Sequence, residues 1–306
     1  MAEELFRRWP VSEEKRRRMD AAYPVFAGDG GQAPFGPSGY MLPVDAEPFL
    51  RQYVQTPVDP GDVWIVTLPK CGTTWTQEMV WLIQNDCDYK GAQCLLCPDR
   101  YQFLEIACIS APHQREEVRQ GNNPISKRNM FSRVEERPKP WFVKTHLPLH
   151  YCPPALLERG KVQPYSEVNQ LPYFPHVLEA WKQRHNPNLL FLFFEDMKRD
   201  LRGTIQKVAD FLGKSLTKEQ LDGLEFNLHF DSMKKNPWVN KSMAYAYSPL
   251  TAEELEAMAA KEPPPQFMRK GQTGDWKNHM SQQTSDKMDA WIQRELAGSD
   301  LKFITG

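Results

Sequence analysis

The residues that most constrain the fold form a turn, 67–75 (TLPKCGTTW), set between two patterned segments. The run before it, residues 63–66, is short and continuously apolar, as expected of a strand buried on both faces. After it, apolar side chains recur at helical spacing, at Trp75, Met79, Leu82 and Ile83. The passage therefore predicts a strand, a tight turn and a helix in direct succession.

A turn of this composition is suited to bind an anion. Gly72 lets the backbone approach a ligand closely with its N–H groups turned inward. A helix that begins near Thr73 directs the positive end of its dipole and its free N–H groups at the same point. Lys70 adds a positive charge, the hydroxyl groups of Thr73 and Thr74 add donors, and Trp75 can stack on a purine. The turn predicts a nucleotide-binding site.

Two other interpretations of the turn stay open at this point. It could be an ordinary strand-to-helix turn with an incidental lysine, since such turns are common in α/β folds. It could also belong to a nucleoside triphosphatase or kinase. That class requires Gly-x-x-x-x-Gly-Lys-Ser/Thr, whereas this turn has one glycine and its lysine on the other side. No aspartate at a strand end stands out as a magnesium ligand, so the triphosphatase interpretation is disfavoured.

The rest of the chain alternates between strand-like and helix-like patterns. Residues 141–143 and 189–194 are strand-like, and three stretches have helical spacing: 174–181, 201–212 before Gly213, and 288–296. This alternation predicts an α/β fold with a parallel sheet covered by helices on both faces. We expect one domain over residues 1–306, with an irregular N-terminal segment over 1–40 because residues 28–39 are rich in turn formers.

Charge and hydropathy narrow the class of function. The 306 residues carry 38 basic and 39 acidic side chains, a formal net charge of −1, which argues against general binding of nucleic acid or of a membrane surface. No apolar run is long enough to span a bilayer, and the first residues have no secretory apolar core. We therefore expect a cytoplasmic protein that holds its anion with a local positive cluster.

The six cysteines fit free thiols in a reducing compartment. Cys94 and Cys97 have the spacing of zinc ligands, but a structural zinc site needs a second close pair, and the chain has none. Reduced thiols are the favoured interpretation, and we expect no metal.

Residues 69–83 (PKCGTTWTQEMVWLI) resemble the 5′-phosphosulfate loop and following helix of the cytosolic sulfotransferases. Serine is commoner than Cys71 in that loop, and the cysteine form is similar to insect members. Further stretches match in the family's order: 144–148 (KTHLP), 193–198 (FFEDMK), 233–237 (MKKNP), and 267–271 (FMRKG) with 274–278 (GDWKN). The resemblance runs from about residue 40 to the C-terminus.

This resemblance implies a P-loop-like three-layer α/β fold and a specific reaction. The reaction is in-line transfer of a sulfuryl group from 3′-phosphoadenosine 5′-phosphosulfate (PAPS) to a hydroxyl or amine of a small molecule. It implies His146 as the general base, a role that suits an imidazole titrating near neutral pH. A simple hydrogen-bonded histidine at a strand end is the alternative. Lys70 would stabilise the leaving phosphate, and Lys144 would hold the sulfuryl oxygens or the acceptor.

The resemblance also implies which residues bind the nucleotide. Trp75 and Phe230 would sandwich the adenine, and the 3′-phosphate would lie on Arg269, Lys270 and the Gly271 amide. The expected binding set is Lys70, Cys71, Gly72, Thr73, Thr74, Trp75, Phe230, Arg269, Lys270 and Gly271.

The chain departs from the family after Val162. There the family continues a strand into Arg-Asn-Pro-Lys/Arg-Asp and a helix with a serine, and that arginine and serine hold the 3′-phosphate. Here Gln163, Pro164 and Tyr165 lead directly towards the helix near Phe174. A few dozen residues are absent, and we expect the sheet to lack one strand–helix unit. An impaired or inactive variant that binds only a ligand or a partner is therefore the alternative to an enzyme.

Two smaller departures follow. Phe194 lacks the hydroxyl of the usual tyrosine. The family's dimer motif aligns with Lys277, Ser281, Gln282 and Asp286, and only its lysine is kept. A homodimer through this motif is therefore disfavoured.

Overall fold

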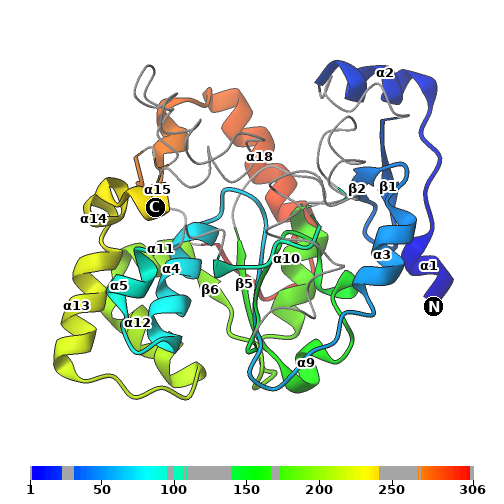
Figure 1. The fold of residues 1–306 in the computed structure, drawn as a ribbon. Helices are drawn as coiled ribbons and strands as arrows, with labels where there is room; N and C mark the ends of the chain where they lie inside the picture. The colour runs from blue at the N-terminus through cyan, green and yellow to red at the C-terminus, as the bar shows by residue number, and fades with distance from the viewer. Residues whose placement is uncertain are drawn as a thin grey trace, which may run out of the picture.

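The computed structural model describes residues 2–22, 31–94, 100–105, 108, 139–166, 173–240, 268 and 270–303 (Figure 1). Its centre is a parallel sheet in the order β4–β3–β5–β6, formed by β4 (Phe142–Thr145), β3 (Val63–Thr67), β5 (Lys161–Ser166) and β6 (Leu192–Phe193). Every residue of β3 is buried, as the apolar run predicts for a central strand. The prediction of an α/β fold with a parallel sheet is confirmed.

Helices cover both faces of this sheet. In Figure 1, α4 (Thr73–Gln84), α12 (Leu201–Phe211) and α13 (Lys218–Leu228) lie to one side of β5 and β6, and α10 (Tyr173–Lys182) lies to the other. The remaining helices are mostly short: α1 (Ala2–Phe6), α2 (Glu13–Ala22), α3 (Glu47–Tyr53), α5 (Tyr89–Ala92), α9 (Leu156–Arg159), α11 (Phe194–Arg199), α14 (Phe230–Lys235), α15 (Pro237–Asn240), α18 (Gln282–Glu295), and the 3₁₀ turns η4 (Leu149–Tyr151) and η5 (Asp275–Asn278). Among the described helices, none is long and apolar enough to cross a membrane.

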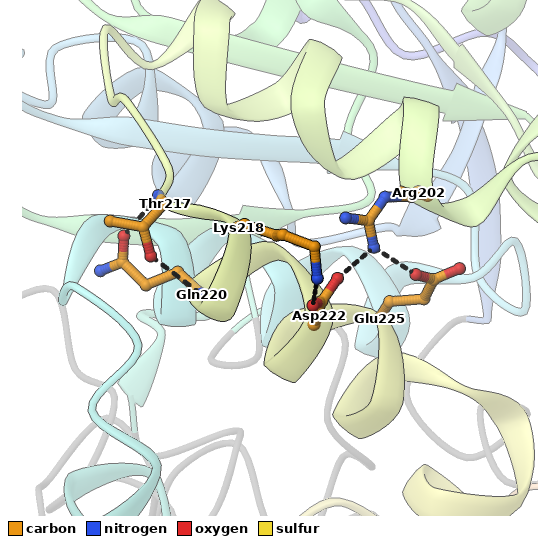
Figure 2. A network of polar contacts seen from close by, with 6 residues as sticks. All are labelled: Arg202, Thr217, Lys218, Gln220, Asp222 and Glu225. Atoms are coloured by element: carbon orange, nitrogen blue, oxygen red, sulfur yellow. Dashed lines mark hydrogen bonds and ion pairs between the residues drawn. The ribbon is translucent and has the colours of Figure 1, made fainter.

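Polar contacts join α12 to α13 (Figure 2). Thr217 and Gln220 form a reciprocal capping box that starts α13. From α12, Arg202 reaches Asp222 at 2.8 Å and Glu225 at 2.7 Å. Exposed ion pairs contribute little, so the helix pair is held mainly by burial of apolar side chains, among them Ile205, Val208, Leu224 and Leu228.

Where the N-terminal segment is described, over residues 2–22 and 31–40, much of it is regular, although we expected residues 1–40 to be irregular. It contains α1, α2 and an antiparallel hairpin of β1 (Gln32–Phe35) and β2 (Tyr40–Pro43). Gly36 and Gly39 have φ of 64° and 65°, so the turn formers reverse the chain rather than leave it unstructured. Phe35 and Tyr40 are buried, and this burial fixes the hairpin to the core. Because one core includes side chains from Phe6 to Leu301, we infer a single domain.

The passage after Val162 forms a strand, β5, in a sheet that we expected to lack one strand–helix unit of the family pattern. β5 pairs in parallel with β3 on one side and with β6 on the other. Backbone N–H and C=O groups on the edges of β3 and β6 need partners, and the residues that follow Val162 supply them. β5 ends at Ser166, and α10 begins at Tyr173.

A second correction concerns residues 189–194, which the sequence predicts to be one strand. Only Leu192 and Phe193 form β6, and Leu189 adds an isolated bridge to Val162. Phe194 already begins α11, whose first turn carries Glu195 and Asp196. Acidic side chains stabilise a helix N-terminus, so the strand-like run ends early.

Candidate active site

The predicted turn and His146 meet at one edge of the sheet. β3 ends at Thr67 and β4 ends at Thr145, and these neighbouring strands run parallel with Val66 opposite Thr145. The segments that follow them therefore leave the sheet side by side at its carboxyl edge, where open α/β sheets bind ligands. The His146 Nδ1 atom lies 2.6 Å from the Thr67 carbonyl oxygen, which confirms the meeting.

The turn has the backbone of an anion site. Gly72 is the N-cap of α4 with φ of 86° and gives no side-chain cap, so the first N–H groups of the helix are not capped by it. Lys70 is exposed and has φ of 67°, a conformation uncommon outside glycine and often found at functional sites. Cys71 is buried, and its Sγ contacts the Pro69 carbonyl at 3.4 Å. The turn is thus a strained, pre-shaped loop with a lysine at its tip.

The two threonines differ in surroundings. The Thr73 hydroxyl lies 2.7 Å from the hydroxyl of Thr67 and so ties the start of α4 to the end of β3. Thr74 is also buried, at the same helical N-terminus. Both backbone N–H groups therefore lie where the loop would hold a phosphate.

The ring of His146 is held in one tautomer. A carbonyl oxygen can only accept, so the contact with Thr67 requires the proton on Nδ1 and leaves the Nε2 lone pair free. Burial, with the nearby Lys144 ammonium, holds the pKa of His146 well below its usual value. The ring also meets the Phe103 ring edge-on, with centroids 5.3 Å apart. Burial therefore favours the neutral form of the imidazole over the imidazolium.

Lys144 brings a buried positive charge to the same place. It lies on β4 opposite Ile65 and is 5% exposed. Its ammonium sits 4.0 Å from the centroid of the Phe103 ring, a cation–π contact. The predicted catalytic residues His146 and Lys144 are thus brought together next to the Lys70 loop.

The two aromatic residues predicted to bind adenine, Trp75 and Phe230, lie near the same lysine. The Trp75 Nε1–H donates to the Leu228 carbonyl at 2.8 Å, and the ring packs against Phe194 at 5.6 Å. The Lys198 ammonium lies 5.9 Å from the Trp75 ring and 5.7 Å from the Phe230 ring. Both rings thus lie within 6 Å of the same ammonium group, which α11 carries.

The predicted 3′-phosphate residues are described only in part. Arg269 lies outside the described residues. The Lys270 ammonium forms a 2.7 Å ion pair with Asp275 and lowers the pKa of that carboxyl to about 2. Gly271 has φ of 59°, and a Cβ placed there would lie 2.2 Å from the Phe230 ring. Gly271 and Phe230 are thus in contact, although they are 41 positions apart in the chain.

Sequence reasoning missed three residues of this site. Lys198 was noted only as part of a motif, and Glu105 and Tyr40 were not singled out. Glu105 accepts a hydrogen bond from the His146 N–H, and the Tyr40 hydroxyl donates to the His146 carbonyl. No local pattern marks such long-range contacts. The signal that the sequence offers is that Glu105 lies in an otherwise apolar segment and Tyr40 directly follows a turn-rich one.

The thiols and the zinc alternative can be followed only where the chain is described. In those residues, no group of three or more His, Cys, Asp or Glu side chains is arranged to hold a metal ion. Cys94 is exposed with a free thiol, and Cys97 lies outside the described residues.

The model of the sulfotransferase domain family matches residues 60–162 and 165–300. The two matched segments adjoin at residues 163 and 164, where the sequence places its departure from the family. Among curated relatives, sulfotransferase 1C2 of Rattus norvegicus is 31% identical, over 80% of this chain and 86% of its own length. Luciferin sulfotransferase of Photinus pyralis is also 31% identical, over 80% of this chain and 74% of its own.

Among solved structures, retinol dehydratase in complex with androsterone and the inactive cofactor PAP superposes with a TM-score of 0.80. It is 28% identical, and the match covers 97% of this chain and 98% of that one. A mouse sulfotransferase complexed with PAP shares the fold at a TM-score of 0.57 and 19% identity. The domain match over most of its length and relatives above 30% identity place this chain in the sulfotransferase family.

Proposed function

We propose that this protein transfers a sulfuryl group from PAPS to a hydroxyl or amine of a small molecule, with His146 as general base. The observation that carries the proposal is the contact between His146 Nδ1 and the Thr67 carbonyl at 2.6 Å. It leaves Nε2 unprotonated at the carboxyl edge of the sheet, beside Lys144 and the Lys70 loop. Two of the solved relatives described above contain PAP.

The residues divide the reaction between them. The acceptor oxygen or nitrogen attacks the sulfur and forms the new bond, while the bond from sulfur to the 5′-phosphate oxygen breaks. His146 Nε2 takes the acceptor proton, and adenosine 3′,5′-bisphosphate (PAP) leaves with the electron pair. Lys70 stabilises the negative charge on the leaving phosphate, and Lys144 holds the equatorial sulfuryl oxygens. The lysines and the N–H groups of the loop supply the positive field.

We propose that the nucleotide lies along three parts of the site. The 5′-phosphate would be held by the loop, through Lys70, Cys71, Gly72, Thr73 and Thr74. The adenine would stack between Trp75 and Phe230, in place of the Lys198 ammonium. The 3′-phosphate would lie on Arg269, Lys270 and the Gly271 amide. The contact between Gly271 and Phe230 supports this arrangement because it joins the last two parts.

We propose an apolar alcohol or phenol as the acceptor. Two retinol dehydratase structures with a TM-score of 0.80 hold androsterone or retinol, and Phe103 places an apolar ring against His146. An apolar wall next to the base favours an acceptor with an apolar body and one polar group.

A second candidate function is supported by the passage after Val162. Pro164 lies opposite Val66 in the register of β5, and proline has no N–H to give to a central strand. The arginine and serine that the family uses for the 3′-phosphate are absent. Loss of a charged contact of this kind weakens binding by about 1.5–3 kcal/mol. The alternative is a protein that binds ligand without efficient turnover.

The test is transfer of labelled sulfate from PAPS to a panel of phenols, retinol and androsterone, alongside calorimetric titration with PAP. We expect transfer by the wild type and its loss in His146→Ala, with PAP affinity unchanged because Nε2 faces the acceptor. Full activity in His146→Ala would exclude the assigned role. PAP binding without transfer to any acceptor would favour the second candidate, and absence of both would contradict each candidate.

A further inference from the structure

We propose that Glu105 and Tyr40 are positioning residues that hold the backbone of His146 from both sides and so aim its Nε2 at the acceptor. The inference rests on the role proposed for His146 and adds two residues to that reaction. It begins from a simple geometric fact. The peptide groups before and after the His146 Cα atom are each bound by a buried side chain.

Glu105 holds the peptide before His146. Its Oε1 atom accepts from the His146 N–H and from the Thr145 hydroxyl, the latter at 2.9 Å. The side chain is almost fully buried, at 1% exposure, and its Oε2 has no hydrogen-bond partner among the described residues. A buried carboxyl with an unpaired oxygen is costly, and such groups are usually retained for a functional reason.

The backbone near Glu105 is itself fixed against β4. The Gln102 N–H donates to the Phe142 carbonyl, and the Lys144 N–H donates to the Gln102 carbonyl, both at 2.8 Å. Gln102 therefore forms a parallel bridge to Val143 at the outer edge of the sheet. This bridge sets where the chain reaches Glu105, and it thereby places the carboxyl at the end of β4.

Tyr40 holds the peptide after His146. Its hydroxyl donates to the His146 carbonyl at 2.8 Å, and the side chain is 5% exposed. Tyr40 begins β2, so the N-terminal hairpin reaches the active site. The hairpin is packed closely there: a Cβ on Gly36 would lie 2.4 Å from the Tyr151 hydroxyl. Only glycine at this turn lets the hairpin approach η4, the 3₁₀ turn after His146.

Together with the ring contact to Thr67, these bonds fix the backbone and the ring of His146. Glu105 binds the N–H, Tyr40 binds the carbonyl and Thr67 binds Nδ1, and these three residues come from different parts of the chain. A general base that is misplaced by 1 Å can lose about 100-fold in rate. Removing the hydrogen bond of Glu105 or of Tyr40 to the His146 backbone should therefore lower kcat and leave nucleotide binding intact.

The test compares conservative variants with a matched control. Tyr40→Phe removes one hydroxyl at the active site. Tyr101→Phe removes the hydroxyl of another buried tyrosine, which donates to the Gln77 carbonyl, also at 2.8 Å, and not to His146. Both variants should lose similar stability in urea unfolding. We expect Tyr40→Phe to lower kcat about tenfold, with a PAP dissociation constant within twofold of wild type, and Tyr101→Phe to keep kcat.

Variants of Glu105 separate positioning from charge. Glu105→Gln keeps a carbonyl oxygen that can accept from the His146 N–H, whereas Glu105→Leu keeps the volume and loses both acceptors. We expect about a 100-fold loss of kcat in Glu105→Leu and less than a threefold loss in Glu105→Gln. Equal losses in the two variants, or equal kcat losses in Tyr40→Phe and Tyr101→Phe, would overturn the proposal.

A readout without turnover separates this inference from the proposed function. In ¹⁵N spectra of the histidine rings, His146 should be in one neutral tautomer with Nδ1 protonated in the wild type. Tyr40→Phe should broaden or shift its ring signals, and Tyr101→Phe should not. If His146→Ala keeps full activity, the proposed role of His146 as the base is wrong. The ring signals of wild type and Tyr40→Phe still test whether Tyr40 positions His146. If His146→Ala is inactive and the ring signals of Tyr40→Phe match those of the wild type, only the positioning role of Tyr40 and Glu105 is contradicted.

Discussion

Gly271→Ala is expected to weaken nucleotide binding through the Phe230 ring. The new Cβ would lie 2.2 Å, 2.3 Å and 2.8 Å from three ring atoms, whereas ordinary contact is 3.4–4 Å. The Phe230 ring must therefore move by more than about 1 Å. Stacking of a base on an aromatic ring contributes about 1–3 kcal/mol. Displacing the ring from the adenine should raise the dissociation constant of PAP roughly five- to 150-fold.

Gly271→Ala also strains the backbone. Substitution of a second glycine, Gly213, provides a control for the cost of this strain alone. Gly271 has φ of 59°, and an alanine in this region costs about 1–2 kcal/mol. Gly213 has φ of 70°, with no atom within 4 Å of its Cβ position, and ends α12 away from the site. Gly213→Ala should therefore lose similar stability in urea unfolding and keep its affinity for PAP. Calorimetric titration with PAP is the assay for all the variants.

A double variant tests whether the effect passes through the ring. If Gly271→Ala acts by moving Phe230, then adding it to Phe230→Ala should cost little more than Phe230→Ala alone. Additive losses would mean that the alanine disturbs the loop itself. An unchanged PAP affinity in Gly271→Ala would refute the assignment of Phe230 to the adenine.

Three further predictions follow from buried contacts. Trp75→Phe should lose about 1 kcal/mol of unfolding free energy because it removes the bond to the Leu228 carbonyl, and urea titration measures this. Arg100→Met should lose about 3–5 kcal/mol because it leaves the buried Glu78 carboxyl unpaired, and Glu78→Leu in the same chain should recover most of the loss. Burial lowers the pKa of His176 from 6.5 to about 4, so the unfolded chain binds the extra proton first. The stabilisation from neutral His176 is therefore full above pH 6.5 and lost as the pH falls towards 4. Urea titrations at several pH values measure the unfolding free energy of wild type and of His176→Gln. The difference between the two should fall from pH 6.5 to pH 4 by on the order of 3 kcal/mol. A difference that does not change with pH would contradict the lowered pKa of His176.

Local signals predicted the elements that carry the chemistry. The run at 63–66 became β3, and the helix after it begins at Thr73, as the glycine and threonines indicate. α12 ends before Gly213, whose φ of 70° suits a glycine at a helix C-terminus. In these segments burial, spacing and turn chemistry agree, so a single window of sequence determines the element.

Long-range contacts explain what the sequence did not reveal. The Tyr40 hydroxyl reaches the His146 carbonyl across 106 positions, and the Glu105 carboxyl reaches the His146 N–H across 41. Neither pairing has a periodic signature. The turn formers near residues 36 and 39 predict an irregular segment, because they do not by themselves reveal that buried Phe35 and Tyr40 flank a tight hairpin. The pairing of the residues after Val162 has no local signal either, since the need of β3 and β6 for partners is a property of the whole sheet.

The shortened passage after Val162 affects the KM for PAPS, whereas the loop at 67–75 and the strand ends affect kcat. A nucleotide site of 1 µM affinity corresponds to about −8.2 kcal/mol, so losing 1.5–3 kcal/mol at the 3′-phosphate would leave a dissociation constant of roughly 10–150 µM. That is weaker binding, but it is not loss of binding. The groups proposed to act on the sulfuryl transfer itself, Lys70, Lys144 and His146, lie on β3, β4 and the residues that follow them. These strands keep their parallel register next to the altered β5. If the 3′-phosphate contacts serve binding alone, the change should raise the KM for PAPS and spare kcat. If they also help to align the reacting phosphate, kcat should fall as well, because remote binding energy can be used to orient the reacting groups.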